Sequence, residues 1–151
     1  EFSRHQKSEE TEVVNLNNLI KEIVKKYDLE KITARLEENL EINIRLNAVK
    51  RCLINLIDNS LAYGKKVEIF TKKTANHVLI FVDDDGPGIP ENERLNVMKP
   101  FYRIDKSRGQ NKSGVGLGLS IANDIIRSHG GNISLEKSPF NGLRVKISLP
   151  L

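Results

Sequence analysis

The feature that most constrains the fold is a pair of neighbouring stretches, KKVEIFTKK at 65–73 and HVLIFVDDD at 77–85. Both alternate and are rich in β-branched residues, which is typical of strands. Only residues 74–76 separate them, so we expect a hairpin. The second stretch runs directly into acidic residues and glycines. The sequence therefore predicts a β-hairpin whose second strand ends in a polar, glycine-rich loop.

Further signals on both sides of the hairpin predict a mixed α/β domain. Residues 11–29 are typical of a short strand followed by a helix, with Asn17 as N-cap candidate. Asn47 is the N-cap candidate of a second helix, which Gly64 ends. The remaining predicted elements are one or two strands within 31–44, a helix from about Leu117 to His129, and strands at 132–138 and 143–149.

Length and composition indicate one domain. The 151 residues, 38% hydrophobic and 29% charged, are enough for one globular core, which we place at 12–151. Residues 1–11 are polar and are expected to be a linker within a fragment of a longer protein. The lone Cys52 excludes an intramolecular disulfide and favours a reducing compartment. The segment contains no run of about 18 apolar residues, so no membrane span is predicted in it.

A polar stripe runs beside the apolar face of the second predicted helix. Arg51, Asn55, Asn59 and Ala62 follow one another at spacings of three or four, so both amides face one way. Asparagine is among the poorer helix formers, which suggests a role for the pair. By itself, a solvated polar face is the simpler interpretation.

Two glycine-rich segments suit a nucleotide. In DDDGPGIP, Asp84 at a strand end suits an exocyclic amine, while Gly86 and Gly88 let the backbone approach a flat ring. In SGVGLGLSI, glycines at a helix start expose N–H groups that suit phosphate. A tight acidic turn and a flexible loop are the respective alternatives. Neither a Rossmann fingerprint nor a Walker loop is matched.

The order of these segments, NLIDNS, DDDGPGIP, PFYR and SGVGLGLSI, closely resembles the N, G1, F and G2 boxes of the histidine kinase catalytic domain. This domain belongs to the GHKL superfamily, with gyrase, the Hsp90 chaperones and the MutL proteins. The resemblance covers 12–151 and is greatest to the EnvZ-like osmosensor subgroup. It implies a two-layer α/β (α+β) sandwich of the Bergerat type, a mixed β-sheet with helices on one face and a mobile ATP lid.

The resemblance also implies roles for individual residues and two cofactors, ATP and Mg²⁺. Asn59 would bind Mg²⁺, and Asp84 would accept a hydrogen bond from the adenine amine. Arg103 would reach phosphate and, with Asn55 and Asn59, form the catalytic set. The other residues implied to contact ATP are Tyr63, Gly86, Gly88, Ile89, Phe101, Tyr102, Gly114, Gly116, Leu117, Gly118 and Leu119.

Asn55 favours a kinase over an ATPase. In the ATP-hydrolysing relatives a glutamate at this position takes a proton from the attacking water, which asparagine does not do. A histidine acceptor needs less help, because a neutral imidazole offers a lone pair at neutral pH. Asp58 lies about 100° around the helix from Asn59 and is not an obvious substitute.

The chain departs from the family pattern at two positions. Ala62 stands where lysine or arginine is frequent, and Met98 where phenylalanine is frequent. The first change puts one phosphate contact in doubt. Lys65, or a lid cation such as Lys106 or Arg108, is the candidate substitute.

The histidine acceptor is expected outside this chain, since no His-Glu/Asp-Leu-Arg-x-Pro motif occurs. His5 is interpreted as linker, and His77 and His129 as structural, the latter in a helix C-terminal turn that favours a cation. The resemblance implies a separate dimerisation and acceptor domain, a helical hairpin that ends in residues 1–11 or is joined to this domain by them as a linker. It also implies a response regulator receiver domain as partner and a homodimeric full-length protein. The domain by itself would be a monomer and would lie in the cytoplasm as part of a bacterial inner-membrane sensor. It would contact the membrane only through segments absent from this chain, and it would have no nucleic-acid partner.

Three other functions remain open. The basic stretch Lys99–Lys112 suits a nucleic-acid-binding module, although Phe101 and Tyr102 are its only aromatic residues. An ATP-driven clamp of the gyrase or chaperone kind is the second, and Asn55 argues against it. A degenerate kinase that has lost nucleotide binding is the third, for which Ala62 is the reason, and the intact glycines and Asp84 argue against it.

Overall fold

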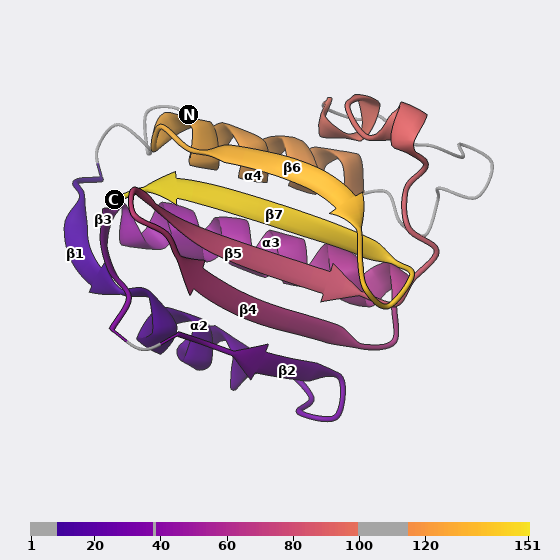
Figure 1. Cartoon of the computed structure of the whole chain (residues 1–151), viewed down its shortest axis with the longest axis horizontal. Coiled ribbons are helices and arrows are strands. Elements are labelled where there is room, and N and C mark those ends of the chain that lie inside the picture. Colours follow the sequence, from indigo (N-terminus) through magenta and orange to yellow (C-terminus); the bar gives the residue numbers. More distant parts are fainter. Residues whose placement is uncertain (1–8, 38, 100–114) are drawn as a thin grey trace.

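A five-stranded sheet with helices α3 and α4 on one of its faces forms the frame of the protein (Figure 1). The computed structural model describes residues 9–37, 39–99 and 115–151, with 115–118 described in backbone only. The elements are β1 (Glu12–Asn15), α2 (Leu16–Val24), β2 (Ile32–Arg35), β3 (Glu41–Ile44), α3 (Leu46–Tyr63), β4 (Val67–Lys73), β5 (His77–Asp84), η1 (Glu91–Glu93), η2 (Asn96–Met98), α4 (Val115–Ser128), β6 (Asn132–Lys137) and β7 (Leu143–Pro150).

The strand order β2-β4-β5-β7-β6 makes the sheet mixed. β2 pairs with β4 in parallel, and every other neighbouring pair in the sheet is antiparallel. The predicted hairpin is β4–β5, with Val67 opposite Asp84 and Lys73 opposite Val78. β1 and β3 form a separate antiparallel pair. The predicted two-layer α/β sandwich is therefore confirmed, while the predicted lid cations Lys106 and Arg108 lie outside the described residues.

The core lies between the sheet and the helices. The apolar stripe of α3, including Cys52, Leu56 and Ile57, is buried as its spacing predicts, and Ile125 and Ile126 of α4 are buried beside it. α2 contacts α3 and β2, and its buried apolar side chains extend this core. Each buried leucine or isoleucine contributes about 1.5–3 kcal/mol. No helix within the described ranges is long and apolar enough to cross a membrane.

The N-cap prediction for α2 is wrong by two residues. The cap is Asn15, whose side-chain oxygen accepts a hydrogen bond from the Asn18 N–H at 3.0 Å. Asn17 is instead buried and donates to the backbone carbonyl of Glu37. Because β1 ends at Asn15 and α2 begins at the next residue, the cap position comes two residues earlier than the apolar spacing suggests.

The N-cap prediction for α3 is also wrong, because the helix begins at Leu46 and Arg45 occupies the cap position without a side-chain bond. The cap comes from Glu9 instead, whose carboxylate accepts from the N–H groups of Asn47 at 2.7 Å and Ala48 at 3.1 Å. A carboxylate also suits the positive end of a helix dipole. The segment that precedes β1 therefore contacts the helix that carries the candidate site.

This contact predicts that Glu9→Ala lowers the free energy of unfolding by about 1 kcal/mol, the usual loss for a removed cap. Urea unfolding followed by circular dichroism measures the change. Glu10→Ala is the matched control, since Glu10 is exposed and has no bond of this kind among the contacts described. Equal stability of the two variants would contradict the capping role.

His129 follows α4 and is held neutral, contrary to the expectation that a cation would suit this position. Its Nε2 accepts from the Arg45 N–H at 3.1 Å, and its Nδ1 lies 2.8 Å from the Ile125 carbonyl, to which it donates. Burial of the ring lowers the pKa of His129, and Arg45 acts in the same direction. The bond to Ile125 and the charge of Glu9 oppose this shift without reversing it.

Because the pKa of His129 is lower in the folded than in the unfolded protein, where it is about 6.5, protonation of this ring favours unfolding. Its contribution to stability is therefore present above pH 6.5 and is lost as the pH falls toward the folded-state pKa. The urea midpoint of the wild type should therefore fall more steeply between about pH 7 and 5 than that of His129→Gln. His77→Gln, at an exposed position, is the control and should follow the wild type. Parallel curves for all three proteins would contradict the assignment.

Candidate functional site

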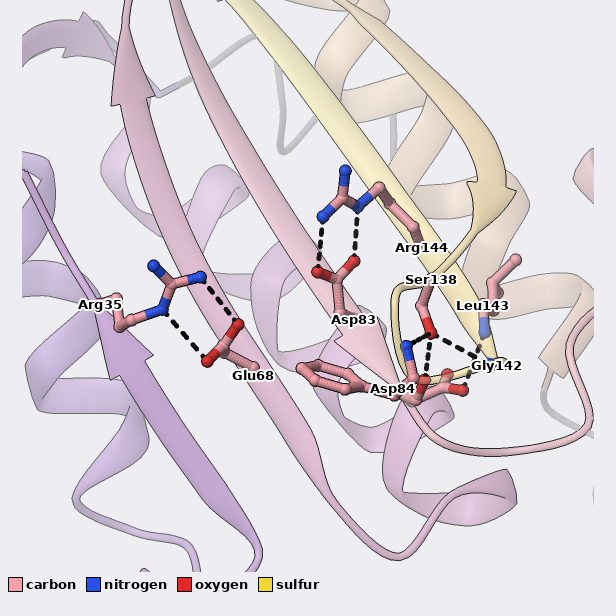
Figure 2. Close-up of polar contacts among 9 residues, drawn as sticks. Arg35, Glu68, Asp83, Asp84, Ser138, Gly142, Leu143 and Arg144 are labelled. Carbon is pink, nitrogen blue, oxygen red and sulfur yellow. Dashed lines mark hydrogen bonds and ion pairs between the residues drawn. The ribbon is translucent and has the colours of Figure 1, made fainter.

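Three consecutive aspartates at the end of β5 have three different roles. Asp83 faces the sheet surface opposite the helices and forms a two-pronged ion pair with Arg144, at 2.8 and 2.9 Å (Figure 2). Asp84, one position along the pleat, faces the other way. Asp85 lies beyond the strand, and its Oδ1 accepts from the N–H groups of Lys65 and Lys66 at 2.7 and 3.0 Å. Only Asp84 is left to face a ligand on the helix side.

Asp84 is buried, with 3% of its surface exposed. Its Oδ1 accepts from the N–H group of Gly86 at 2.9 Å. It also accepts from the N–H group of Leu143 at 3.0 Å (Figure 2). Burial raises the pKa of this carboxyl, while the bonds from Leu143 and Gly86 and a bond from the Ser60 hydroxyl oppose the rise. The result is a desolvated carboxylate in a fixed orientation, which suits recognition of a hydrogen-bond donor.

Close backbone packing surrounds this carboxylate. A Cβ at Gly142, in the β6–β7 turn, would lie 2.3 Å from both the backbone oxygen and Oδ1 of Asp84. Gly88 has a φ of +75°, in the left-handed region that favours glycine, and a Cβ there would lie 3.3 Å from the Gly142 carbonyl. Gly88, which was predicted as a site residue, therefore packs against Gly142 of the β6–β7 turn, which was not.

The candidate segments meet at one end of the sandwich. Figure 1 shows the ends of β5 and α3, the start of α4 and the β6–β7 turn together at the right of the view. Gly116, Leu117 and Gly118 lie in the first turns of α4, whose initial N–H groups have no partner within the helix. Leu119 is buried in the core. Phe101, Tyr102, Arg103 and Gly114 lie outside the described residues.

On α3, the two asparagines are half-buried on one face, as their spacing predicts. The Nδ2 atom of Asn59 is buried and has no hydrogen-bond partner among the residues described. Asp58 is occupied elsewhere, since it accepts a hydrogen bond from the Tyr27 hydroxyl at 2.8 Å. Burial, followed by that bond, raises the pKa of Tyr27, so the phenol remains a donor. These contacts agree with the prediction that Asp58 is not a substitute base.

The residues fit a magnesium ion of the kind that is held mainly by phosphate and water. The Asn59 amide has unmet hydrogen-bonding capacity, and rotation of the amide exchanges its nitrogen and oxygen. No group of three or more histidine, cysteine, aspartate or glutamate residues occurs within the described ranges to form a closed metal cage. Magnesium usually keeps several waters and uses few protein oxygens, so one amide oxygen is a suitable ligand.

Two further predicted residues flank the loop. Tyr63, the last residue of α3, is 42% exposed, and Ile89 is partly buried against the core. Ser60, Ser138, Gly142 and Leu143 contact Asp84 but were not predicted as site residues. The only local signal was the turn sequence SPFNG at 138–142, which predicts a turn and not its neighbour.

Comparison with known proteins agrees with this geometry. Residues 44–151 match the family described as histidine kinase-, DNA gyrase B- and HSP90-like ATPase. The sensor histidine kinase GtrS of Pseudomonas aeruginosa is 44% identical over 103 residues, 68% of this chain and 21% of GtrS. The sensor histidine kinase CpxA of Escherichia coli is 41% identical over 106 residues, 70% of this chain and 23% of CpxA. The solved catalytic domain of the histidine kinase ThkA matches with a TM-score of 0.81 and 27% identity, over 93% of this chain and 95% of that one.

The fold and the family match define an ATP-binding domain of the GHKL class. The chain belongs to the histidine kinase-, DNA gyrase B- and HSP90-like ATPase family, and its relatives within it are sensor histidine kinases. The predicted family is therefore confirmed, CpxA is compatible with the predicted EnvZ-like subgroup, and the kinase is favoured over the gyrase or chaperone clamp. The chain spans about a fifth of the length of GtrS and CpxA.

The two adjacent carboxyls should respond in opposite ways to the same substitution. The pKa of Asp84 is raised, so its ionised form costs stability at neutral pH, and Asp84→Asn should leave the urea midpoint at pH 7 unchanged or higher. The bonds from Lys66 and Lys65 lower the pKa of Asp85, so its ionised form stabilises the fold above the unfolded-state pKa, and Asp85→Asn should lower the midpoint. A lower midpoint for Asp84→Asn than for Asp85→Asn would contradict this assignment.

Proposed function

We propose that this domain binds ATP with the adenine amine at Asp84, Mg²⁺ at Asn59 and the phosphates toward the start of α4, and that it transfers the γ-phosphoryl group to a histidine of another domain. The observation that carries the proposal is the desolvated Asp84 carboxylate, fixed through Oδ1 by two backbone N–H groups. Such an acceptor at the end of a strand discriminates a base that presents an amine from one that presents a carbonyl.

The residues of α3 position the triphosphate and do not activate water. Asn59 would supply an oxygen to Mg²⁺, whose role is to neutralise charge on the phosphates. Asn55 is one turn earlier on the same face and is not a general base. Asp58 is bound to Tyr27. A histidine brought close by another domain then receives the phosphoryl group, because its neutral ring has a lone pair ready.

The phosphate end of the site would include residues of the first turns of α4 and of the segment before it. Gly114, Gly116, Leu117, Gly118 and Leu119 would approach the phosphates through the helix start. Arg103 would reach phosphate from the preceding segment, and Phe101 and Tyr102 would frame the lid with it. Lys65 is the candidate replacement for the basic residue missing at Ala62. It is exposed, and its backbone is held next to the site by Asp85.

The partners follow from the kind of relatives that the chain has. We propose that the acceptor lies on the dimerisation domain of the same protein, that the full-length protein is a homodimer, and that a response regulator receiver domain takes the phosphoryl group next. The domain described here would act in the cytoplasm as part of a bacterial inner-membrane sensor. Sensor histidine kinases such as GtrS and CpxA are the relatives that support this assignment.

Calorimetric titration with a non-hydrolysable ATP analogue, with and without Mg²⁺, tests the proposal. Wild-type binding should tighten with Mg²⁺, and Asn59→Asp should alter this Mg²⁺ dependence. Asp84→Asn should weaken binding by about 100-fold, because the adenine amine then faces a neutral side-chain amide in place of a carboxylate. Asp58→Asn, adjacent to Asn59 but turned toward Tyr27, is the control and should bind as the wild type does. Unchanged binding in Asp84→Asn would overturn the assignment of the base.

A further inference from the structure

The hydroxyl of Ser138 joins the β6–β7 turn to the end of β5. It donates to the backbone carbonyl of Asp84 at 2.6 Å and accepts from the N–H groups of Phe140 at 3.1 Å and Gly142 at 2.9 Å (Figure 2). A serine hydroxyl has one proton to donate and two lone pairs, so all of its hydrogen-bonding capacity is used here. The residue is 3% exposed, which excludes water as a ready replacement for these partners.

This hydroxyl determines where the next residues lie. The Ser138 N–H also donates to the Gly142 carbonyl at 2.9 Å, so the turn closes on itself at Ser138. Gly142 is thereby pressed against Asp84, where no Cβ would fit, and the following N–H, that of Leu143, donates to Asp84 Oδ1 at 3.0 Å. Ser138 therefore holds Asp84 twice, directly through its main chain and indirectly through the side-chain bond from Leu143.

We propose that Ser138 is a positioning residue for base recognition, which fixes the Asp84 carboxylate through the β6–β7 turn without itself contacting the nucleotide. The proposal rests on the assignment of the adenine amine to Asp84 made above. It adds a determinant of base specificity from a turn that follows the last glycine-rich segment by some twenty residues. The ligand class is an adenine nucleotide, in contrast to one whose base presents a carbonyl at the same edge.

A purely structural role for Ser138 makes a different prediction. If the hydroxyl only stabilised the turn, its loss would lower stability and would weaken all ligands alike. If it positions Asp84, its loss frees Leu143 to move, and the bond that opposes the rise in the pKa of Asp84 weakens. Asp85, the charged neighbour that acts on Asp84, raises the same pKa and is unchanged by the substitution. The pH below which ADP binding declines should then move upward.

The test compares Ser138→Ala and Ser138→Cys with the wild type, under reducing conditions, by calorimetry with ADP and GDP across pH. Cysteine keeps the volume but is only a weak donor, and it serves if the alanine variant does not fold. Both variants should weaken ADP binding on the order of tenfold, the effect of one lost buried hydrogen-bond partner, and should reduce the ratio of ADP to GDP affinity. Ser134→Ala, the same change within β6 and away from the turn, is the control and should leave affinity and pH profile unchanged.

Three results would overturn the positioning role. The first is wild-type affinity and pH profile in both variants, and the second is an equal loss for ADP and GDP. The third is wild-type behaviour in Ser138→Cys alone, which would assign the effect to volume. Asp84→Asn, measured in parallel, separates this proposal from the one on which it rests. If Asp84→Asn loses ADP while the Ser138 variants do not, only the positioning role fails, and if Asp84→Asn binds ADP normally, the base assignment fails as well.

Discussion

A single buried carboxylate, that of Asp84, sets the requirements that the surrounding structure meets. A desolvated carboxylate is costly unless it is hydrogen-bonded, and here two backbone N–H groups converge on one of its oxygens. One of them comes from the loop directly after β5, and the other from β7. The carboxylate is thus satisfied by elements that only the folded sheet brings together, and its raised pKa shows that the compensation is incomplete. That residual cost is consistent with a site kept for binding.

The pleat of β5 separates this carboxylate from its neighbour. Asp83 is fully buried on the opposite face, paired with Arg144, whose guanidinium also lies 4.7 Å from the centre of the Phe81 ring. Phe81 stacks on Phe70 with ring centres 4.4 Å apart. Removal of one partner from such a buried pair costs about 3–5 kcal/mol, so Arg144 fixes β7 against β5. The ion pair on the outer face therefore supports the register that places Leu143 beside Asp84 on the inner face.

Much of the fold and part of the site could be predicted because their signals are local. Alternation identified the β4–β5 hairpin, the spacing of apolar residues identified the buried face of α3, and the order of four short segments identified the family. Asp84 was selected among the three aspartates by its place at a strand end beside the glycines, and the resemblance implied its role toward adenine. The structure adds the directions in which the three side chains face. What could not be predicted is non-local. Glu9 caps a helix 38 residues away, and Ser138 and Leu143 reach Asp84 across 54 and 59 residues.

The two incorrect caps show the same limit. Asn15 and Asn17 are equally suitable residues, and the end of β1 decides between them. For α3, the cap is a side chain from another part of the chain, so the nearest asparagine was the wrong candidate. Sequence patterns indicate that a helix starts in a region, whereas the partner of its free N–H groups depends on the tertiary fold.

The most direct test of the central claim is a crystal structure of this chain with Mg²⁺ and ADP. The account predicts the exocyclic amine of adenine within about 3 Å of an Asp84 carboxylate oxygen, with the bonds from Gly86 and Leu143 to Oδ1 still present. An adenine ring bound away from Asp84, or a carboxylate turned away from a bound base, would contradict it.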